Sequence, residues 1–282
     1  NGDTWTQLSL GGSRSLDHLS VSPVDENIIF TSIGNELYGT FNGGISWNQL
    51  IANTPHNITS IDFKPDNKDI AIITLGGFED GYKVYLTEDG GDNWSNISYD
   101  LPNIPVNSAV LQKGNNGSIY IGNDYGVFQL DMVKKSWNLF SQNLPIVPVT
   151  DMVIDESENK LYISTYGRGI WMSEISAPSV LEISLAPTIF DGSGGTTLLK
   201  INSNQKWIIS YSDAYSDYDI LNIPEAVKLG EGIKEITLNV SKNNANILRT
   251  GTLTVTCDGC SETQSINVTQ KGRIIGVTPM SI

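Results

Sequence analysis

The sequence predicts an all-β protein in which a β-propeller part precedes an Ig-like β-sandwich. A tryptophan returns at nearly regular intervals along the first part, and short apolar runs are separated there by Gly, Asp and Asn turns. Charged residues make up only 17% of the chain. Units of about 40 to 50 residues with four short strands each are typical of propeller blades.

The repeat is visible in the residues themselves. Trp5, Trp47, Trp94 and Trp137 lie 42, 47 and 43 residues apart. "DLPNIPVNSAV" returns as "NLPIVPVTDMV", and "SIYIGNDYGVF" returns as "KLYISTYGRGIW". Within one unit, "ITSIDFKPD", "DIAIITLGG", "YKVYLTED" and "WSNIS" have the length and turn spacing of four strands.

Counting these units predicts four blades over residues 1–176. Three units are complete, a fourth stops after three strands, and the chain opens on the outer strand "TWTQLSL". That strand can complete the last blade of a four-bladed ring, because closure removes sheet edges. Alternatively, the blades are the C-terminal part of a propeller with roughly six to eight blades. The start in mid-motif favours the larger propeller.

A turn motif accompanies the tryptophans. "TFNGGISW" and "TEDGGDNW" fit the pattern Ser/Thr-x-Asp-x-Gly-x-Thr/Ser-Trp, apart from Asn42 and Asn93, and "NGDTW" fits its end. The motif resembles the Asp-box (BNR) repeats of sialidase-like, sortilin-like and xyloglucanase-like propellers. We expect a structural role, because a short carboxylate accepts hydrogen bonds from its own turn. Calcium binding and catalysis are less favoured. The motif residues are Asn42, Gly44, Trp47, Asp89, Gly91, Trp94 and Trp137.

The composition changes after the repeats, and residues 180–272 predict about seven strands of a sandwich. The segment "GGT…SN..W" ending at Trp207, the strand "RTGTLTV" and the closing "VTQKG" resemble the BACON domain, an Ig-like module of Bacteroidetes extracellular proteins. That resemblance implies carbohydrate binding. A tryptophan flanked by Ile208 and Ile209 is more typical of a core than of a sugar platform, so we expect a spacer. Residues 273–282 are expected to form a linker.

The two cysteines, Cys257 and Cys260, form a single CxxC motif. Redox chemistry and half a zinc site are both consistent with such a motif. Asp258 and Gly259 between them are typical of a hairpin turn, and no second CxxC exists. The sequence therefore favours a disulfide in an oxidising compartment, with no metal site and no cofactor.

Charge and resemblance restrict the location and the partners. A formal net charge of −14 disfavours nucleic acid, and no apolar run reaches the ~20 residues of a transmembrane segment. The run from "DLPNIPVN" to "TYGRGIW" resembles the propeller ends of large secreted Bacteroidetes proteins, many exported by type IX secretion. This implies an extracellular or outer cell-surface location. Expected partners are a glycan, a protein ligand or the upstream part of the same polypeptide as a separate chain.

Candidate binding residues lie in the turns that link the second strand to the third in each blade. Tyrosines with a few acids and one arginine suit a sugar or peptide ligand, although ordinary hairpin turns have a similar composition. The candidates are Glu79, Asp80, Tyr82, Asp124, Tyr125, Tyr166 and Arg168.

The composition disfavours two kinds of enzyme site. A sialidase-like site requires three arginines, whereas the first part has only Arg14 and Arg168. A xyloglucanase-like site requires two carboxylates across the glycosidic bond, for which Asp80 and Asp124 are weak candidates without a motif. We therefore expect a non-catalytic extracellular binding or scaffold segment. The alternatives are the C-terminal half of a glycoside hydrolase completed by missing blades and a ligand-free stalk.

Overall fold

The computed structural model describes residues 4–11, 14–114, 117–177, 180–213, 219–245, 247–257 and 263–272. Within these ranges the regular structure is β-strand apart from one 3-10 turn at Glu225–Val227, which confirms the all-β prediction. The chain divides into two compact units between residues 178 and 179, and each is described by itself.

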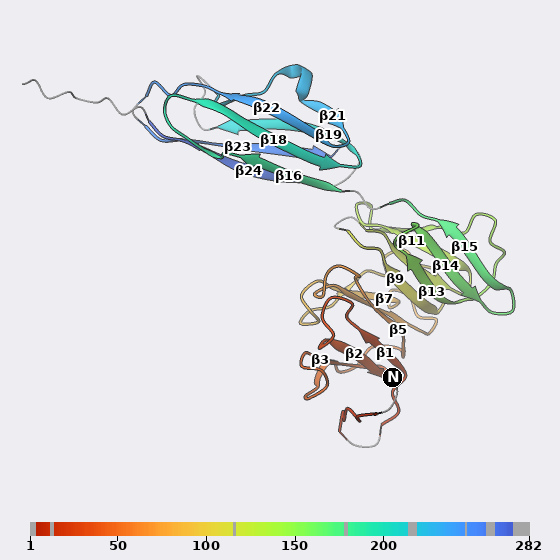
Figure 1. Ribbon diagram of the computed structural model, residues 1–282. Helices are drawn as coiled ribbons and strands as arrows, with labels where there is room; N and C mark the ends of the chain where they lie inside the picture. Colours follow the sequence, from red (N-terminus) through yellow and green to blue (C-terminus); the bar gives the residue numbers. More distant parts are fainter. Residues whose placement is uncertain are drawn as a thin grey trace, which may run out of the picture. The chain divides into compact units, whose positions relative to one another are not determined.

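The first unit contains four antiparallel sheets that use the chain in order (Figure 1). Sheet 1 has β1 (His18–Val21), β2 (Ile29–Ile33), β3 (Glu36–Thr40) and β4 (Asn48–Ile51). Sheet 2 has β5 (Ile58–Phe63), β6 (Ala71–Leu75), β7 (Val84–Thr87) and β8 (Ser95–Asn96). Sheet 3 has β9 (Val106–Leu111), β10 (Ile119–Asn123), β11 (Gly126–Asp131) and β12 (Ser136–Leu139). Sheet 4 has β13 (Val149–Asp155), β14 (Lys160–Thr165) and β15 (Gly169–Glu174).

The first strands of successive sheets pack side by side, from β1 through β5 and β9 to β13. Where these strands begin, Thr59 Oγ1 donates a hydrogen bond to Val106 O (2.5 Å), and Asn107 Nδ2 donates to Val149 O (3.1 Å). Where they finish, Lys64 Nζ donates to Gln112 O (2.9 Å). The first residues of each strand thus contact the start of the next strand, and the last residues contact its end. The strands β5, β9 and β13 therefore run in the same direction. We call the two ends of the sheets the leading end and the trailing end.

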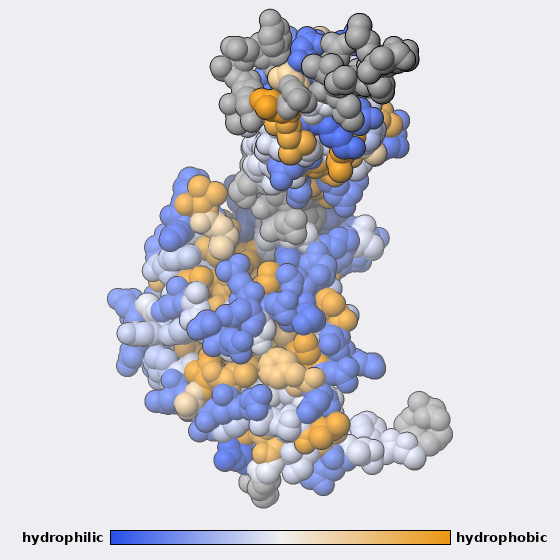
Figure 2. Space-filling model, turned by 90° about the vertical axis from the view of Figure 1, so that its left-hand side faces the viewer, coloured by the Kyte–Doolittle hydropathy of each residue, from blue (hydrophilic) through white to orange (hydrophobic). Residues whose placement is uncertain are grey.

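Burial separates the inner sheets from the outer ones. Every residue of β6 and β10 is buried, because sheets 2 and 3 are covered on both faces. In contrast, all six residues of β15 are exposed, and Leu19 on β1 is 64% exposed. On the surface drawn in Figure 2, hydrophobic residues (orange) are exposed among hydrophilic ones (blue). Sheets 1 and 4 therefore each have a neighbour on one side only.

The strand predicted for "TWTQLSL" is not formed. Residues 4–10 adopt no regular structure, and the side chain of Trp5 is 92% exposed. An outer strand must pair with the edge of a third strand, and β3, β7 and β11 are already paired with β4, β8 and β12. Only β15 lacks such a partner among the described strands, and residues 4–10 do not pair with it.

The second unit has two sheets around one apolar core. One sheet has the order β16 (Leu181–Ala186), β18 (Gly195–Ser203), β22 (Lys234–Val240), β20 (Leu221–Asn222). The other has β17 (Ile189–Phe190), β24 (Thr263–Gln270), β23 (Arg249–Cys257), β19 (Lys206–Asp213), β21 (Leu229–Glu231). The described ranges thus contain nine strands rather than about seven. Three of the nine, β17, β20 and β21, have only two or three residues each.

Two residues of this unit bear on the sequence expectations. Trp207 is 2% exposed, packs against Gly230 and donates its indole N–H to Gly232 O (3.1 Å), so it is a core residue. Cys257 is buried on β23 and is not a free thiol. Cys260 lies outside the described residues, and its predicted pairing with Cys257 stays a prediction.

Trp137 allows a test of the packing between sheets 2 and 3. It is 6% exposed, and its indole N–H donates to Ile97 O (2.9 Å). Trp137→Ala should lower the free energy of unfolding by about 3–5 kcal/mol, because it removes a buried ring and leaves a cavity. Guanidinium titration measures this value. Val133→Ala, at an 83% exposed position between β11 and β12, is the control and should change it by less than about 0.5 kcal/mol. Equal effects of the two variants would contradict the packing described here.

Candidate functional site

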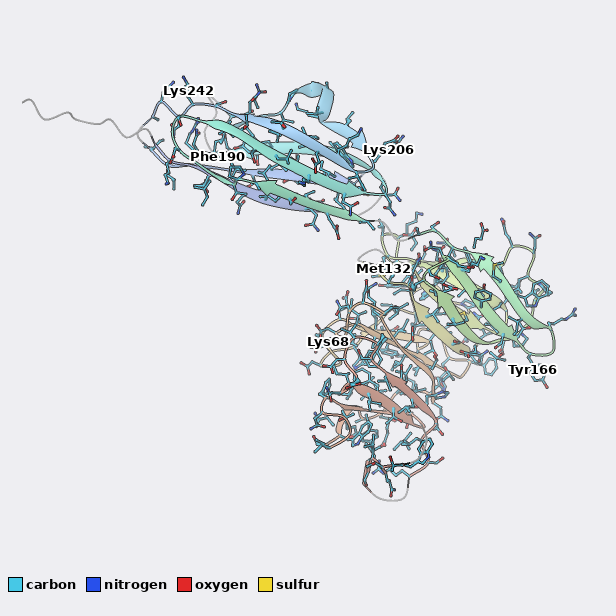
Figure 3. All side chains as sticks on the ribbon, in the orientation of Figure 1. Lys68, Met132, Tyr166, Phe190, Lys206 and Lys242 are labelled. Carbon is cyan, nitrogen blue, oxygen red and sulfur yellow. The ribbon has the colours of Figure 1, made fainter. Side chains whose placement is uncertain are left out.

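Three exposed tyrosines occupy the same connection in three successive sheets. Tyr82 precedes β7, Tyr125 precedes β11 and Tyr166 precedes β15, each between the second and third strands of its sheet. Their exposed fractions are 44%, 47% and 77%. Figure 3 shows Tyr166 at the tip of the hairpin that joins β14 to β15. All three turns lie at the leading end, because the second strand runs back toward the start of the first.

The turn that carries Tyr125 is held by amide side chains. Asn123 Oδ1 accepts the N–H groups of Tyr125 (2.8 Å) and Gly126 (3.1 Å). Asn107 Nδ2 donates to Asp124 Oδ1 (2.9 Å) as well as to Val149 O (3.1 Å). Asp124 is thus held where sheets 3 and 4 meet, and its carboxylate keeps further acceptor capacity toward solvent.

A buried lysine supports the longer loop before β7. Lys83 is fully buried, and its ammonium donates to Gly77 O (2.7 Å). Burial lowers the pKa of Lys83, whereas the carboxylates of Asp80 and Glu79 raise it. His56 packs against Gly77, and its Nε2 lies 3.5 Å from Glu79 Oε2. These contacts fix the base of the loop and leave Tyr82 at its end exposed.

The third turn is closed by its own backbone and side chains. Thr165 Oγ1 donates to Gly169 O (2.7 Å), and the Trp171 indole donates to Arg168 O (3.0 Å). Tyr166 N donates to Pro148 O (2.9 Å), which joins the turn to the start of β13. Arg168 is exposed and forms no ion pair with a described carboxylate, so its guanidinium faces solvent.

The structure therefore places all seven predicted binding residues in leading-end turns of sheets 2 to 4. The two weak catalytic candidates lie in turns of different sheets, Asp80 between β6 and β7 and Asp124 between β10 and β11. His56, Lys83, Asn107 and Asn123 support this surface but were not predicted. Asn107 becomes Thr150 in the next repeat, so the repeat pattern carried no signal for it.

The turns predicted as Asp-boxes, residues 40–47 and 87–94, lie at the opposite, trailing end. Gly43 and Gly90 donate backbone hydrogen bonds to Asn27 O and Asp69 O, in the turns between first and second strands. Inside one box, Asp89 Oδ1 accepts from the Thr87 hydroxyl and from Asn93 N (both 2.9 Å). Asn42 Oδ1 accepts from Thr40 and Ser46 N in the same way. The Asn42 amide thus makes these two Oδ1 contacts, while its Nδ2 donates to Ser46 Oγ (2.9 Å) where Asp89 Oδ2 accepts from Asn93 Nδ2 (2.8 Å).

These contacts stabilise the ionised form of Asp89. Hydrogen bonds from the Asn93 side chain and backbone, followed by the Thr87 hydroxyl, lower the pKa of Asp89. Within the described ranges no group of three or more His, Cys, Asp or Glu residues is arranged to hold a metal ion. The carboxylate of Asp89 accepts hydrogen bonds from residues of its own turn.

A half-buried carboxyl, that of Asp62, lies near the trailing end beside a cavity of about 300 Å³ between the first strands. Asp62, Glu156, Val21 and Leu111 are among the lining residues. Asp62 Oδ2 accepts the N–H of Leu111 (3.0 Å). Burial raises the pKa of Asp62 to about 6, against the opposing effect of that hydrogen bond. Asp62 is therefore partly protonated near neutral pH.

Comparison with known proteins shows that this chain is similar to several solved structures. No family model matches the chain, and no curated protein matches it. A GH74 enzyme from Niastella koreensis is 10% identical with a TM-score of 0.45, over 90% of this chain and 38% of that one. An auxiliary nutrient binding protein from Bacteroides thetaiotaomicron is 19% identical with a TM-score of 0.45, over 56% and 38%.

A third similar structure is the β-propeller domain of Cps50 (Swd1) from Myceliophteria thermophila. It is 13% identical with a TM-score of 0.44, over 91% of this chain and 84% of that one. The chain thus spans less than half of the enzyme and of the nutrient binding protein.

Within the described residues, no helix is long and apolar enough to cross a lipid bilayer.

The role of the Asp-box carboxylate can be tested by two substitutions. Asp89→Asn should lower Tm much less than Asp89→Ala, because the amide of Asn42 makes the two corresponding Oδ1 contacts in the neighbouring turn, whereas alanine makes neither. Differential scanning fluorimetry measures both, with Asp92→Ala in the same turn as the control. Calcium or a chelator should leave the Tm of the wild type unchanged. A calcium-dependent rise in Tm that Asp89→Asn abolishes would show that the carboxylate binds the ion.

The raised pKa of Asp62 predicts how stability changes with pH. Between pH 3.8 and about 6 the folded state binds more protons at Asp62 than the unfolded state. Its contribution to stability therefore falls as pH rises through this window and stays reduced above it. Asp62→Asn should be more stable than the wild type by about 2 kcal/mol at pH 7.5 and by much less at pH 4. Denaturant titrations at the two values measure this, with Asp92→Asn as the control, and a pH-independent difference would contradict it.

Proposed function

We propose that this chain is an extracellular, non-catalytic binding segment whose first unit takes a neutral oligosaccharide at its leading end. The observation that carries the proposal is the exposed tyrosine at the same turn of three successive sheets, Tyr82, Tyr125 and Tyr166. A tyrosine ring offers an apolar face to a sugar ring, and its hydroxyl offers a hydrogen bond. Glu79, Asp80 and Asp124 supply acceptors for sugar hydroxyls, and Arg168 supplies donors.

The same proposal covers the architecture. Residues 1–176 are Asp-box β-propeller blades belonging to a larger propeller, residues 180–272 are a BACON-like Ig-type spacer, and residues 273–282 are a linker. Sheets that follow one another with their first strands side by side support the propeller. Two sheets around a single core support the sandwich, and the buried Trp207 favours a spacer over a second sugar platform.

A binding role fits the leading end better than hydrolysis. Glycoside hydrolysis requires two carboxyl groups on either side of one bond. Asp124 is held by the Asn107 amide, and Asp80 lies in a turn of another sheet, between β6 and β7. Hydrogen bonds made by Lys83 and Asn123 hold the bases of two of these turns. A supported turn loses little conformational entropy on binding.

Glycan binding by the purified chain tests this proposal. Neutral oligosaccharides should give hits on a glycan array, and calorimetry with one hit should give a measurable Kd. Tyr82→Ala, Tyr125→Ala and Tyr166→Ala should each weaken binding several-fold to about tenfold, because each removes one stacking face. Phe41→Ala is the matched control, since Phe41 is 43% exposed in the Asp-box turn at the trailing end.

Three results would contradict the proposal. Binding that is unchanged in all three tyrosine variants would place the ligand elsewhere, and an array without hits would favour a stalk. Hydrolysis of aryl glycosides or xyloglucan by the chain would favour the glycoside hydrolase alternative.

A further inference from the structure

Sheet 4 has an open edge and a groove beside it. The outer edge of β15 has no partner among the described strands, whereas β3, β7 and β11 each pair with a fourth strand. A groove of about 680 Å³ lies next to β15, within the first unit. Its lining includes Val127, Phe140, Leu144, Leu161, Ile163, Trp171 and Ser173.

The internal repeat shows what this groove corresponds to. One repeat earlier, Trp137 shares a buried cluster with seven residues at the matching positions. These are Val84, Ile97, Leu101, Ile119, Ile121, Phe128 and Leu130. Each one is 42 or 43 residues before one of the groove residues named above. The groove is therefore the site of an outer-strand tryptophan that sheet 4 does not contain.

The contacts of Trp137 define what an occupant would do there. Trp137 pairs with Leu130 on β11, donates its indole N–H to Ile97 O (2.9 Å), and donates its backbone N–H to Asp100 Oδ1 (2.7 Å). The matching positions at the groove are Ser173, Phe140 and Asn143. An added strand would thus place its tryptophan opposite Ser173, with acceptors available at Phe140 O and at the Asn143 side chain.

This chain carries one segment of the required kind without a sheet. Residues 5–8, Trp-Thr-Gln-Leu, match residues 47–50, Trp-Asn-Gln-Leu, where β4 begins. Leu8 packs against Gly44 as Leu50 packs against Gly91 one repeat later. Leu8 thus lies against sheet 1 in the position of an outer-strand residue of a preceding sheet, while Trp5 is 92% exposed.

We propose that residues 4–10 of a second copy of this chain form the fourth strand of sheet 4, with Trp5 in the groove beside β15. Sheet 1 of the second copy then covers sheet 4 of the first. Within one copy β1 does not pack on β13 as successive first strands pack on each other. Exposed apolar residues lie on both surfaces, Leu19 and Val21 on β1 and Ile170 and Met172 on β15.

The contact is head-to-tail, so each copy has one donating and one accepting surface. Such contacts form rings when the rotation closes and filaments when it does not. Two copies that close supply eight sheets, within the range of known propellers. The inference rests on the propeller arrangement proposed above. In it, a second copy of the chain supplies the sheets that complete the larger propeller. It does not depend on what the tyrosines bind.

Light scattering after size-exclusion chromatography tests the contact on the full chain. The wild type is expected to be a dimer. Trp5→Ala and Ser173→Arg should each shift it to the monomer, because the first removes the inserted ring and the second blocks its place. Ile45→Ala, an exposed apolar change on sheet 1, and Ser184→Arg on β16 are the matched controls and should stay dimeric.

A peptide of residues 1–10 tests the groove separately. The peptide NGDTWTQLSL should bind the Trp5→Ala chain and should not bind the Trp5→Ala, Ser173→Arg double variant. Acrylamide quenching should show Trp5 protected in the wild-type dimer, from the difference between the wild type and Trp5→Ala.

Each other outcome decides against the proposal. A monomer with an exposed Trp5 would rule out residues 4–10 as the occupant, and a monomer with a protected Trp5 would show closure within one chain. A dimer that survives both substitutions would place the contact elsewhere. A monomer that still binds a neutral oligosaccharide through its tyrosines would overturn this inference alone and leave the proposed function standing.

Discussion

The first unit depends on one constraint, which is that a sheet with two apolar faces must be covered on both. Trp137 meets this constraint between sheets 2 and 3, where its ring is buried and its indole N–H is satisfied by Ile97 O of the preceding sheet. The outer strand of one sheet is thus tied to the sheet before it. Every residue of β6 and β10, the second strands of sheets 2 and 3, is buried as a result, while every residue of β15 in sheet 4 is exposed.

This arrangement separates the two ends of the sheets. At the trailing end Lys64, Asp66 and Glu156 link successive sheets, with Gly114 N donating to Asp66 (2.6 Å) and Lys113 N to Glu156 (2.8 Å). The turns at residues 40–47 and 87–94 are closed by their own hydrogen bonds at the same end. The leading-end turns are held by their bases only, so the tyrosine rings remain exposed. Structural contacts and the proposed ligand surface therefore use different parts of the same repeat.

Much of this could be predicted from local patterns. The spacing of Trp47, Trp94 and Trp137 marks the successive sheets, and the place of Tyr125 between two short apolar runs marks a turn. The supporting residues could not be predicted. Asn107 acts through Val149 O, which is 42 residues away, and Lys83 is buried beneath a loop of glycines. Ordinary polar residues gain such roles only from their neighbours in space, and a single sequence does not give those neighbours.

The sequence by itself determined the period of the repeat, the strand and turn order within it, and the self-contained chemistry of the Asp-box turn, because each depends on residues close together in the chain. Only the tertiary structure decided that residues 4–10 lack a sheet, that Trp207 is buried and that Asp62 lies in a cavity that raises its pKa. These outcomes depend on which strand edge is free and which face is covered. Both are set by contacts between distant segments, since pairing and burial are properties of the assembled sheets.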